Sequence, residues 1–127
     1  MALPILASGI TPQQADQIVQ SRIPGKHQEG HCTEYALNLG NTLERMKVPY
    51  SRIHYIWWDN GKSQMHVIVW FKTSDGQGWL ADNETSHPIK EDGVLSRSNA
   101  LRWITAWNSP FGGPVSDVQI SYITPIR

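Results

Sequence analysis

The tetrapeptide Asp59–Lys62 constrains the fold more than any other part of the sequence. It reads DNGK, and an Asn-Gly pair accepts the positive φ angles that a two-residue β-hairpin turn requires. Segments with strand character flank it: Arg52–Trp58 before the turn and Gln64–Phe71 after it, the latter with three consecutive β-branched residues. Because a turn this short joins only antiparallel strands, the sequence predicts a sheet built around an antiparallel hairpin.

Two helices are predicted before this hairpin. The first spans Thr11–Arg22, with Thr11 as the N-cap and Gln14 in the position that completes a capping box. The second spans Cys32–Lys47, where apolar side chains recur at the spacing of one buried helical face. Cys32 lies at the very start of this second helix and on the same apolar stripe.

The remainder of the chain reads mainly as strands. Trp79–Asp82 is predicted to be a third strand, Ser98–Trp107 a short helix, and the alternation of apolar and polar residues over Val118–Tyr122 a last strand. No βαβ alternation and no linker-like tract interrupts this order. The sequence therefore predicts one α+β domain over residues 1–127, with N-terminal helices packed on a mostly antiparallel sheet.

Composition excludes several classes of function. Eleven Lys and Arg balance eleven Asp and Glu, which argues against a basic nucleic-acid-binding face and against a polybasic membrane binder. The single cysteine, Cys32, rules out a disulfide framework and a four-cysteine zinc site. The segment Met1–Ile10 lacks the basic start of a signal peptide, so a cytoplasmic location is expected, although export without a signal peptide would leave the same sequence.

Three residues on consecutive predicted elements form a candidate catalytic set. Cys32 begins a helix, whose positive end favours a thiolate anion. His66 lies in the middle of a strand, where it can take up and return a proton. Asp82 ends the next strand and can orient the imidazole through its other nitrogen. If these two strands are neighbours, His66 and Asp82 can lie side by side.

The same segments resemble the bacterial transglutaminase-like cysteine proteinases. Gly30–Ala36, GHCTEYA, is similar to that family's nucleophile motif Gly-x-Cys-x-[Asp/Glu]-Tyr-Ala. His66–Val69 resembles its histidine strand, and Trp79–Asn83 resembles its Trp-x-Leu-Asp-Asn segment. The resemblance extends over about Gly30–Ile89, roughly half of the chain.

This resemblance implies a papain-like/transglutaminase-like core and a cysteine hydrolase or acyl-transfer enzyme. It assigns Cys32 as the nucleophile, His66 as the general base and then acid, and Asp82 as the orienting group. Gln28 is the candidate side-chain donor for the oxyanion, and Asn83 is a supporting residue. A protein or peptide substrate is implied, with no cofactor. No calcium site is carried over, because Thr33 stands where an acidic residue is common in the calcium-dependent members.

Other interpretations of these residues stay open at this point. Cys32 can be a small buried apolar residue, His66 a core histidine and Asp82 a turn former. Zinc is a competing possibility, but no short paired ligand spacing is present, so no metal is expected. The non-enzymatic alternative is a binding or inhibitory module of the same fold, whose partner contacts an exposed aromatic patch drawn from Trp57, Trp58, Trp103 and Trp107.

Overall fold

A computed structural model of the protein describes residues 9–111 and 114–123, and it has an α+β architecture. The described elements are, in chain order, α1 (Pro12–Gln20), α2 (Cys32–Arg45), β1 (Tyr50–Asp59), β2 (Lys62–Lys72), β3 (Gly78–Ala81), β4 (Ile89–Glu91), α3 (Arg97–Asn108), the short 3-10 helix η1 (Ser109–Phe111) and β5 (Val115–Ile123). Most of Met1–Ile10, in which no signal peptide is predicted, lies outside the described residues.

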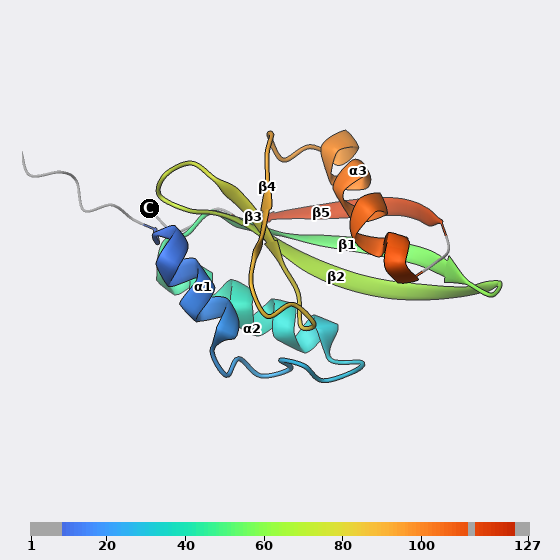
Figure 1. Ribbon diagram of the computed structural model, residues 1–127, viewed down its shortest axis with the longest axis horizontal. Helices are drawn as coiled ribbons and strands as arrows, with labels where there is room; N and C mark the ends of the chain where they lie inside the picture. The colour runs from blue at the N-terminus through green and yellow to red at the C-terminus, as the bar shows by residue number, and fades with distance from the viewer. Residues whose placement is uncertain (1–8, 112–113, 124–127) are drawn as a thin grey trace, which may run out of the picture.

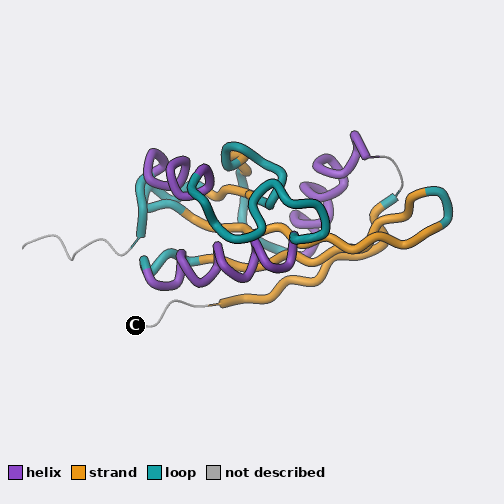
Figure 2. Tube along the Cα trace, turned by 90° about the horizontal axis from the view of Figure 1, so that it is seen from below, coloured by secondary structure: helices purple, strands orange, loops and turns teal. Residues whose placement is uncertain are grey.

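The five strands form one antiparallel sheet in the order β4-β3-β2-β1-β5 (Figure 1). The predicted hairpin turn is confirmed: Asn60 and Gly61 have φ angles of 51° and 78°, and Asp59 pairs with Lys62. The tip of this hairpin projects past the helices (Figures 1 and 2). β5 returns to pair with β1, so the sheet is a meander with its last strand added to the opposite edge.

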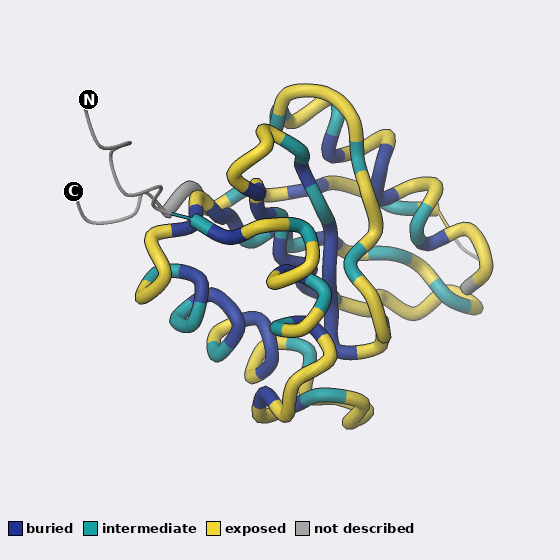
Figure 3. Tube along the Cα trace, turned by 60° about the vertical axis from the view of Figure 1, so that its left-hand side comes forward, coloured by how far each residue is buried: buried dark blue, intermediate teal, exposed yellow. Residues whose placement is uncertain are grey.

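Helices cover both faces of the sheet. One apolar cluster joins α1 and α2 to one face, through residues such as Leu39 and Val69. The other cluster joins α3 to the opposite face, through residues such as Ile68 and Ile104. Figure 3 shows the buried residues running through the strands and the inner sides of the helices, while much of the loop surface is exposed. Alternate residues of each central strand therefore belong to different cores.

The helix predictions are confirmed: α1 and α2 are shorter than predicted, and α3 extends one residue further at each end than the predicted Ser98–Trp107. Thr11 caps α1, and its side chain and that of Gln14 form the expected reciprocal capping box. α1 ends at Gln20 and not at Arg22, because the chain turns extended at Ser21. α2 ends at Arg45 and not at Lys47, since Lys47 has a φ of 57°, outside the helical range.

The strands differ from the prediction in some details. The loop around Pro88 contains the short strand β4, which pairs with β3 at the sheet edge. Met65 shares its strand face with Val67 and Val69, but unlike them it is 63% exposed. Met65 lines the cavity that also contains Cys32. Asp82 follows β3 directly and does not belong to it.

Candidate active site

Cys32 is the first residue of α2, and local backbone geometry aims the start of that helix at a cavity. Gly30 has a φ of 78°, which turns the preceding loop, and His31 is the N-cap. The His31 side chain does not cap the helix but pairs with Glu34, with Nδ1 and Oε2 2.5 Å apart. The first backbone N–H groups of α2 are thus left without a side-chain partner at the end that carries the thiol. Cys32 itself is half-buried.

His66 and Asp82 are in direct contact. Nε2 of His66 lies 2.7 Å from Oδ2 of Asp82, which is the contact that the strand order led us to expect. The register explains it: Val69 pairs with Ala81, so the next residue, Asp82, reaches back along β2 to His66. The pair is sheltered, with the Asp82 side chain 3% exposed and that of His66 17% exposed.

The Asp82 carboxylate is held in one orientation by its own turn. Its Oδ1 accepts hydrogen bonds from the backbone N–H groups of Glu84 (3.0 Å) and Thr85 (2.9 Å), which leaves Oδ2 for His66. Burial by itself raises the pKa of Asp82, but the hydrogen bond and charge of His66 and the two backbone N–H groups outweigh it, so the pKa is lowered. Asp82 is therefore an anion at neutral pH.

Tyr55 packs against the His66 ring. The two residues are directly opposite in the β1–β2 register, and their rings meet edge to face with centroids 5.6 Å apart. The Tyr55 hydroxyl donates to Oδ1 of Asn108 at the end of α3, over 3.4 Å. Burial, and then the nearby charges of Asp82 and Cys32, raise the pKa of Tyr55, which keeps it neutral. Since Nε2 faces Asp82, the other ring nitrogen of His66, Nδ1, is the one available to a substrate or to the thiol.

Tyr55 and Asn108 were not predicted from the sequence, although one signal was available for Tyr55. A two-residue turn fixes the register of a hairpin, so the turn at Asn60-Gly61 places residue 55 opposite residue 66. No comparable signal locates Asn108, because its position depends on how α3 packs on the sheet.

The three predicted catalytic residues line one cavity of about 600 Å³. Cys32, His66 and Asp82 share its wall with Tyr55 and with Trp107 from α3. Within the described residues, the only polar contact of the Cys32 sulfur is with the Thr33 hydroxyl at 4.0 Å, and no hydrogen bond joins the thiol to His66. Catalytic hydrogen bonds are often long in ligand-free structures and tighten when substrate binds.

The cavity lies beside an open edge of the sheet. β3 pairs with β2 only from Val69 to Lys72, so within the described part of the chain Lys62–Ile68 have no neighbouring strand on that side. His66 belongs to the sheet face that α3 covers, together with Ile68, whereas α2 and Cys32 pack on the other face. Side chains from the two faces can border a common space only around such a free edge, and here Cys32 and His66 line one cavity.

The two supporting residues named from the sequence lie in different surroundings. Gln28 is exposed, and its side chain is not among those that line the Cys32 cavity, so the structure does not bring it to the thiol. Its backbone carbonyl accepts a hydrogen bond from Nδ2 of Asn83 over 2.9 Å. Asn83 is 2% exposed and also receives, through its own carbonyl, the N–H of His27 at 2.7 Å. Asn83 thereby ties the loop before Cys32 to the turn of Asp82.

The tryptophans do not form one exposed patch. Trp103 is 5% exposed and belongs to the core under α3, so its inclusion in a surface patch was wrong. Trp57 and Trp107 are partly buried and line the cavity, and Trp58 is 42% exposed near the hairpin tip.

The possible metal ligands are dispersed. Among residues 9–111 and 114–123, no group of three His, Cys, Asp or Glu side chains is placed to hold a metal ion. His87, for example, pairs with Asp16 of α1 at 2.6 Å, and His31 pairs with Glu34. In the same described ranges, no helix is long and apolar enough to cross a membrane.

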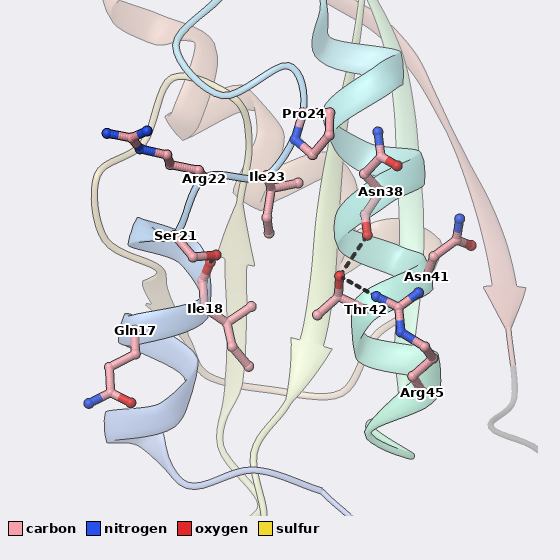
Figure 4. Close-up of a pocket in the computed structure, with 10 residues that line it drawn as sticks. All are labelled: Gln17, Ile18, Ser21, Arg22, Ile23, Pro24, Asn38, Asn41, Thr42 and Arg45. Carbon is pink, nitrogen blue, oxygen red and sulfur yellow. Dashed lines mark hydrogen bonds between the residues drawn. The ribbon is translucent and has the colours of Figure 1, made fainter.

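A second cavity, of about 480 Å³, lies between α1 and α2 (Figure 4). It is lined mainly by amide, hydroxyl and guanidinium groups, and within it Thr42 accepts a hydrogen bond from Arg45 over 3.3 Å. None of the three predicted catalytic residues borders it.

Scans against protein-family models, curated proteins and solved structures gave no match to this chain.

Proposed function

We propose that the protein is a cysteine-dependent hydrolase or acyl-transfer enzyme that acts on an amide bond of a protein or peptide, on a papain-like/transglutaminase-like core. One observation carries this proposal. A buried carboxylate, Asp82, holds His66 by Nε2 in a cavity whose wall also contains a cysteine at a helix N-terminus. An ordinary core histidine needs neither the anionic partner nor a thiol in the same cavity.

In the first half-reaction, Cys32 Sγ attacks the carbonyl carbon of the amide while His66 Nδ1 holds the thiol proton. The carbon–sulfur bond forms, the carbon–nitrogen bond then breaks, and His66 returns the proton to the leaving amine. The product is a thioester on Cys32. Asp82 stays ionised throughout and stabilises the His66 imidazolium through its hydrogen bond to Nε2.

In the second half-reaction, an acceptor attacks the thioester carbonyl. With water as the acceptor, His66 removes a proton from the water, the carbon–sulfur bond breaks, and the thiolate is reprotonated by His66 as a carboxylic acid leaves. An amine in the place of water gives transamidation, and a side-chain amide as the substrate gives deamidation. Water is the default acceptor at an open cavity.

The backbone N–H of Cys32 is the oxyanion donor that the fold itself provides. It is the first N–H of α2, and no carbonyl within the described residues accepts it. The partial positive charge of the helix N-terminus acts at the same place as the developing oxyanion.

The test is the alkylation rate of Cys32 by iodoacetamide as a function of pH, followed by mass spectrometry. Because the chain has one cysteine, every adduct reports on Cys32. We expect rapid alkylation that persists at about pH 6, well below the range in which a free thiol ionises, and its loss in His66→Ala. His54→Ala is the matched control, since His54 lies on the neighbouring strand β1 but does not line the cavity. Alkylation that rises only near about pH 8.5 in all three proteins would contradict the proposal.

One observation favours the alternative of a non-catalytic binding module. Ile56 and Met65 are opposite each other on β1 and β2, and they are 44% and 63% exposed, with Trp58 nearby at 42%. Exposed apolar side chains grouped in this way are typical of a protein-binding surface. Cys32→Ala separates the two functions, because it abolishes thioester chemistry and leaves a surface on the hairpin unchanged.

A further inference from the structure

The wall of the Cys32 cavity carries negative charge without a matching cation. Glu29 and Glu84 line the cavity together with Asp82, and no lysine or arginine of the described ranges does. Asp82 is paired with His66, whereas neither Glu29 nor Glu84 forms an ion pair within the described residues. A cleft lined by one sign of charge concentrates its field and attracts ligands of the opposite sign.

Lys26 is near Asp82 and Glu84, but its ammonium group already has other partners. Its Nζ donates to the backbone carbonyl of Thr85, and the ammonium lies 5.0 Å from the centre of the Tyr35 ring. Burial lowers the pKa of Lys26, against the attraction of Asp82 and Glu84, and the side chain does not line the cavity. Lys26 thus offsets part of the charge of Glu84, and no ion pair among the described residues includes Glu29.

A buried acceptor without a donor is a second, independent sign. Asn83 lines the cavity, and its Nδ2 donates to the Gln28 carbonyl, which fixes the orientation of the amide. Its Oδ1 is then directed away from that carbonyl, is itself buried, and has no hydrogen-bond donor among the described residues. An N–H group of a ligand that reached this oxygen would satisfy an acceptor that the described residues leave unpaired.

Aromatic rings complete the wall. Trp57, Trp107 and Tyr55 line the same cavity. The face of an aromatic ring attracts an ammonium or guanidinium group, and tryptophan does so most strongly. Carboxylates, a free amide oxygen and aromatic faces are together the surroundings that a cationic N–H donor prefers.

We propose that the Cys32 cavity selects substrates that carry a cationic side chain, that of lysine or arginine, beside the amide bond. This inference rests on the proposed function for its chemistry, since it names the substrate class of the same site. Glu29 and Glu84 are its specificity-determining residues.

Charged thiol reagents test it without the need for a known substrate. Methanethiosulfonates with a trimethylammonium-ethyl, a methyl or a sulfonato-ethyl group all convert a thiolate to a mixed disulfide and release methanesulfinate. Their rates with Cys32 are each divided by their rates with 2-mercaptoethanol, a neutral thiol, at the same pH and low salt. We expect the resulting ratio of cation to anion to be about tenfold or more for the native protein.

Substitutions of the two glutamates test whether they cause the preference of Cys32 for the cationic reagent. Glu29→Gln and Glu84→Gln should each lower the ratio by about threefold, and the double variant should bring it near one. Glu44→Gln is the control, because Glu44 is twelve positions along α2 from Cys32, about 18 Å away. The ratio should also collapse at about 1 M salt, where the screening length is about 3 Å.

A native ratio near one, or a high ratio that the double variant retains, would overturn the proposal. Either result is distinct from a failure of the proposed function. Thiosulfonates react with any accessible thiolate. The proposed function is tested separately, by the effect of His66→Ala on alkylation by neutral iodoacetamide.

Discussion

Asp82→Asn replaces one carboxylate oxygen in the cavity by an NH₂ group. We expect this change to remove most of the enhanced reactivity of Cys32. The aspartate accepts three hydrogen bonds, two from backbone N–H groups at Oδ1 and one from His66 at Oδ2. The introduced amide can keep the two backbone bonds through its oxygen, but its NH₂ group then faces Nε2 of His66. Because two donors cannot pair, Nε2 must become the acceptor, and the imidazole proton moves to Nδ1. The nitrogen that faces the cavity is then no longer a base.

The size of the effect follows from the bond that is lost. A hydrogen bond to a charged partner contributes about 1.5–3 kcal/mol, and this one is 2.7 Å long and almost wholly buried. Each 1.36 kcal/mol is a factor of ten, so the alkylation rate of Cys32 at about pH 6 should fall roughly tenfold to a hundredfold. The free energy of unfolding should fall by no more than about 3 kcal/mol, within the 5–15 kcal/mol of a typical domain, so the variant should remain folded.

The assay is the iodoacetamide rate at about pH 6, with urea unfolding of the same preparation as the test of folding. Asp75→Asn is the matched control: Asp75 also accepts a backbone N–H within a turn, that of Gln77 at 3.2 Å, but it does not line the cavity. Equal rates for the native protein and a folded Asp82→Asn variant would refute the role of Asp82 in orienting His66.

Four further outcomes are expected. Since the pKa of Asp82 is lowered on folding, its contribution to stability is complete above its ordinary value of 3.8 and is lost as pH falls through the folded value; urea unfolding should show a steeper acid loss for the native protein than for Asp82→Asn. Gly76 has a φ of +90°, and a Cβ added there would meet no atom within 4 Å, so Gly76→Ala should lower the free energy of unfolding by about 1–2 kcal/mol. Gly25→Ala, at +91° with a Cβ only 2.8 Å from the Tyr35 backbone nitrogen, should cost about 1–3 kcal/mol more in the same assay. Trp103→Ala should lower the free energy of unfolding by about 3–5 kcal/mol, because it empties a site in the core under α3, and a loss below about 1 kcal/mol would contradict that placement.

Local chemistry made much of the fold predictable. The Thr11 capping box and the Asn60-Gly61 turn are each complete within four residues, so the sequence alone specifies them. β4 has no such signal: its three residues, Ile89–Glu91, are held by their pairing with β3, which depends on the loop that brings them back. The position of β5 beside β1 is likewise a result of tertiary packing.

In the candidate site, too, local patterns could locate some residues, while the positions of others depend on tertiary packing. The contact between His66 and Asp82 followed from two adjacent strands, and the position of Tyr55 could have followed from the hairpin register. Glu29 and Trp107 reach the cavity from a loop and from the end of α3, far apart in sequence, so neither spacing nor periodicity could have located them. Patterns within the sequence thus identify the groups that would react but not the walls that surround them.

The end of β3 at Ala81 explains how residues from opposite faces of the sheet come to line one cavity. Strand alternation puts His66 on the face that α3 covers, while α2 brings Cys32 to the other face, so the two can share a cavity only where β2 has a free edge. If β3 continued past Ala81 along β2, it would close that edge. Asp82 prevents this, because its carboxylate accepts the N–H groups of Glu84 and Thr85 and folds the chain into a turn. The residue that orients His66 therefore also opens the space in which His66 and Cys32 can meet.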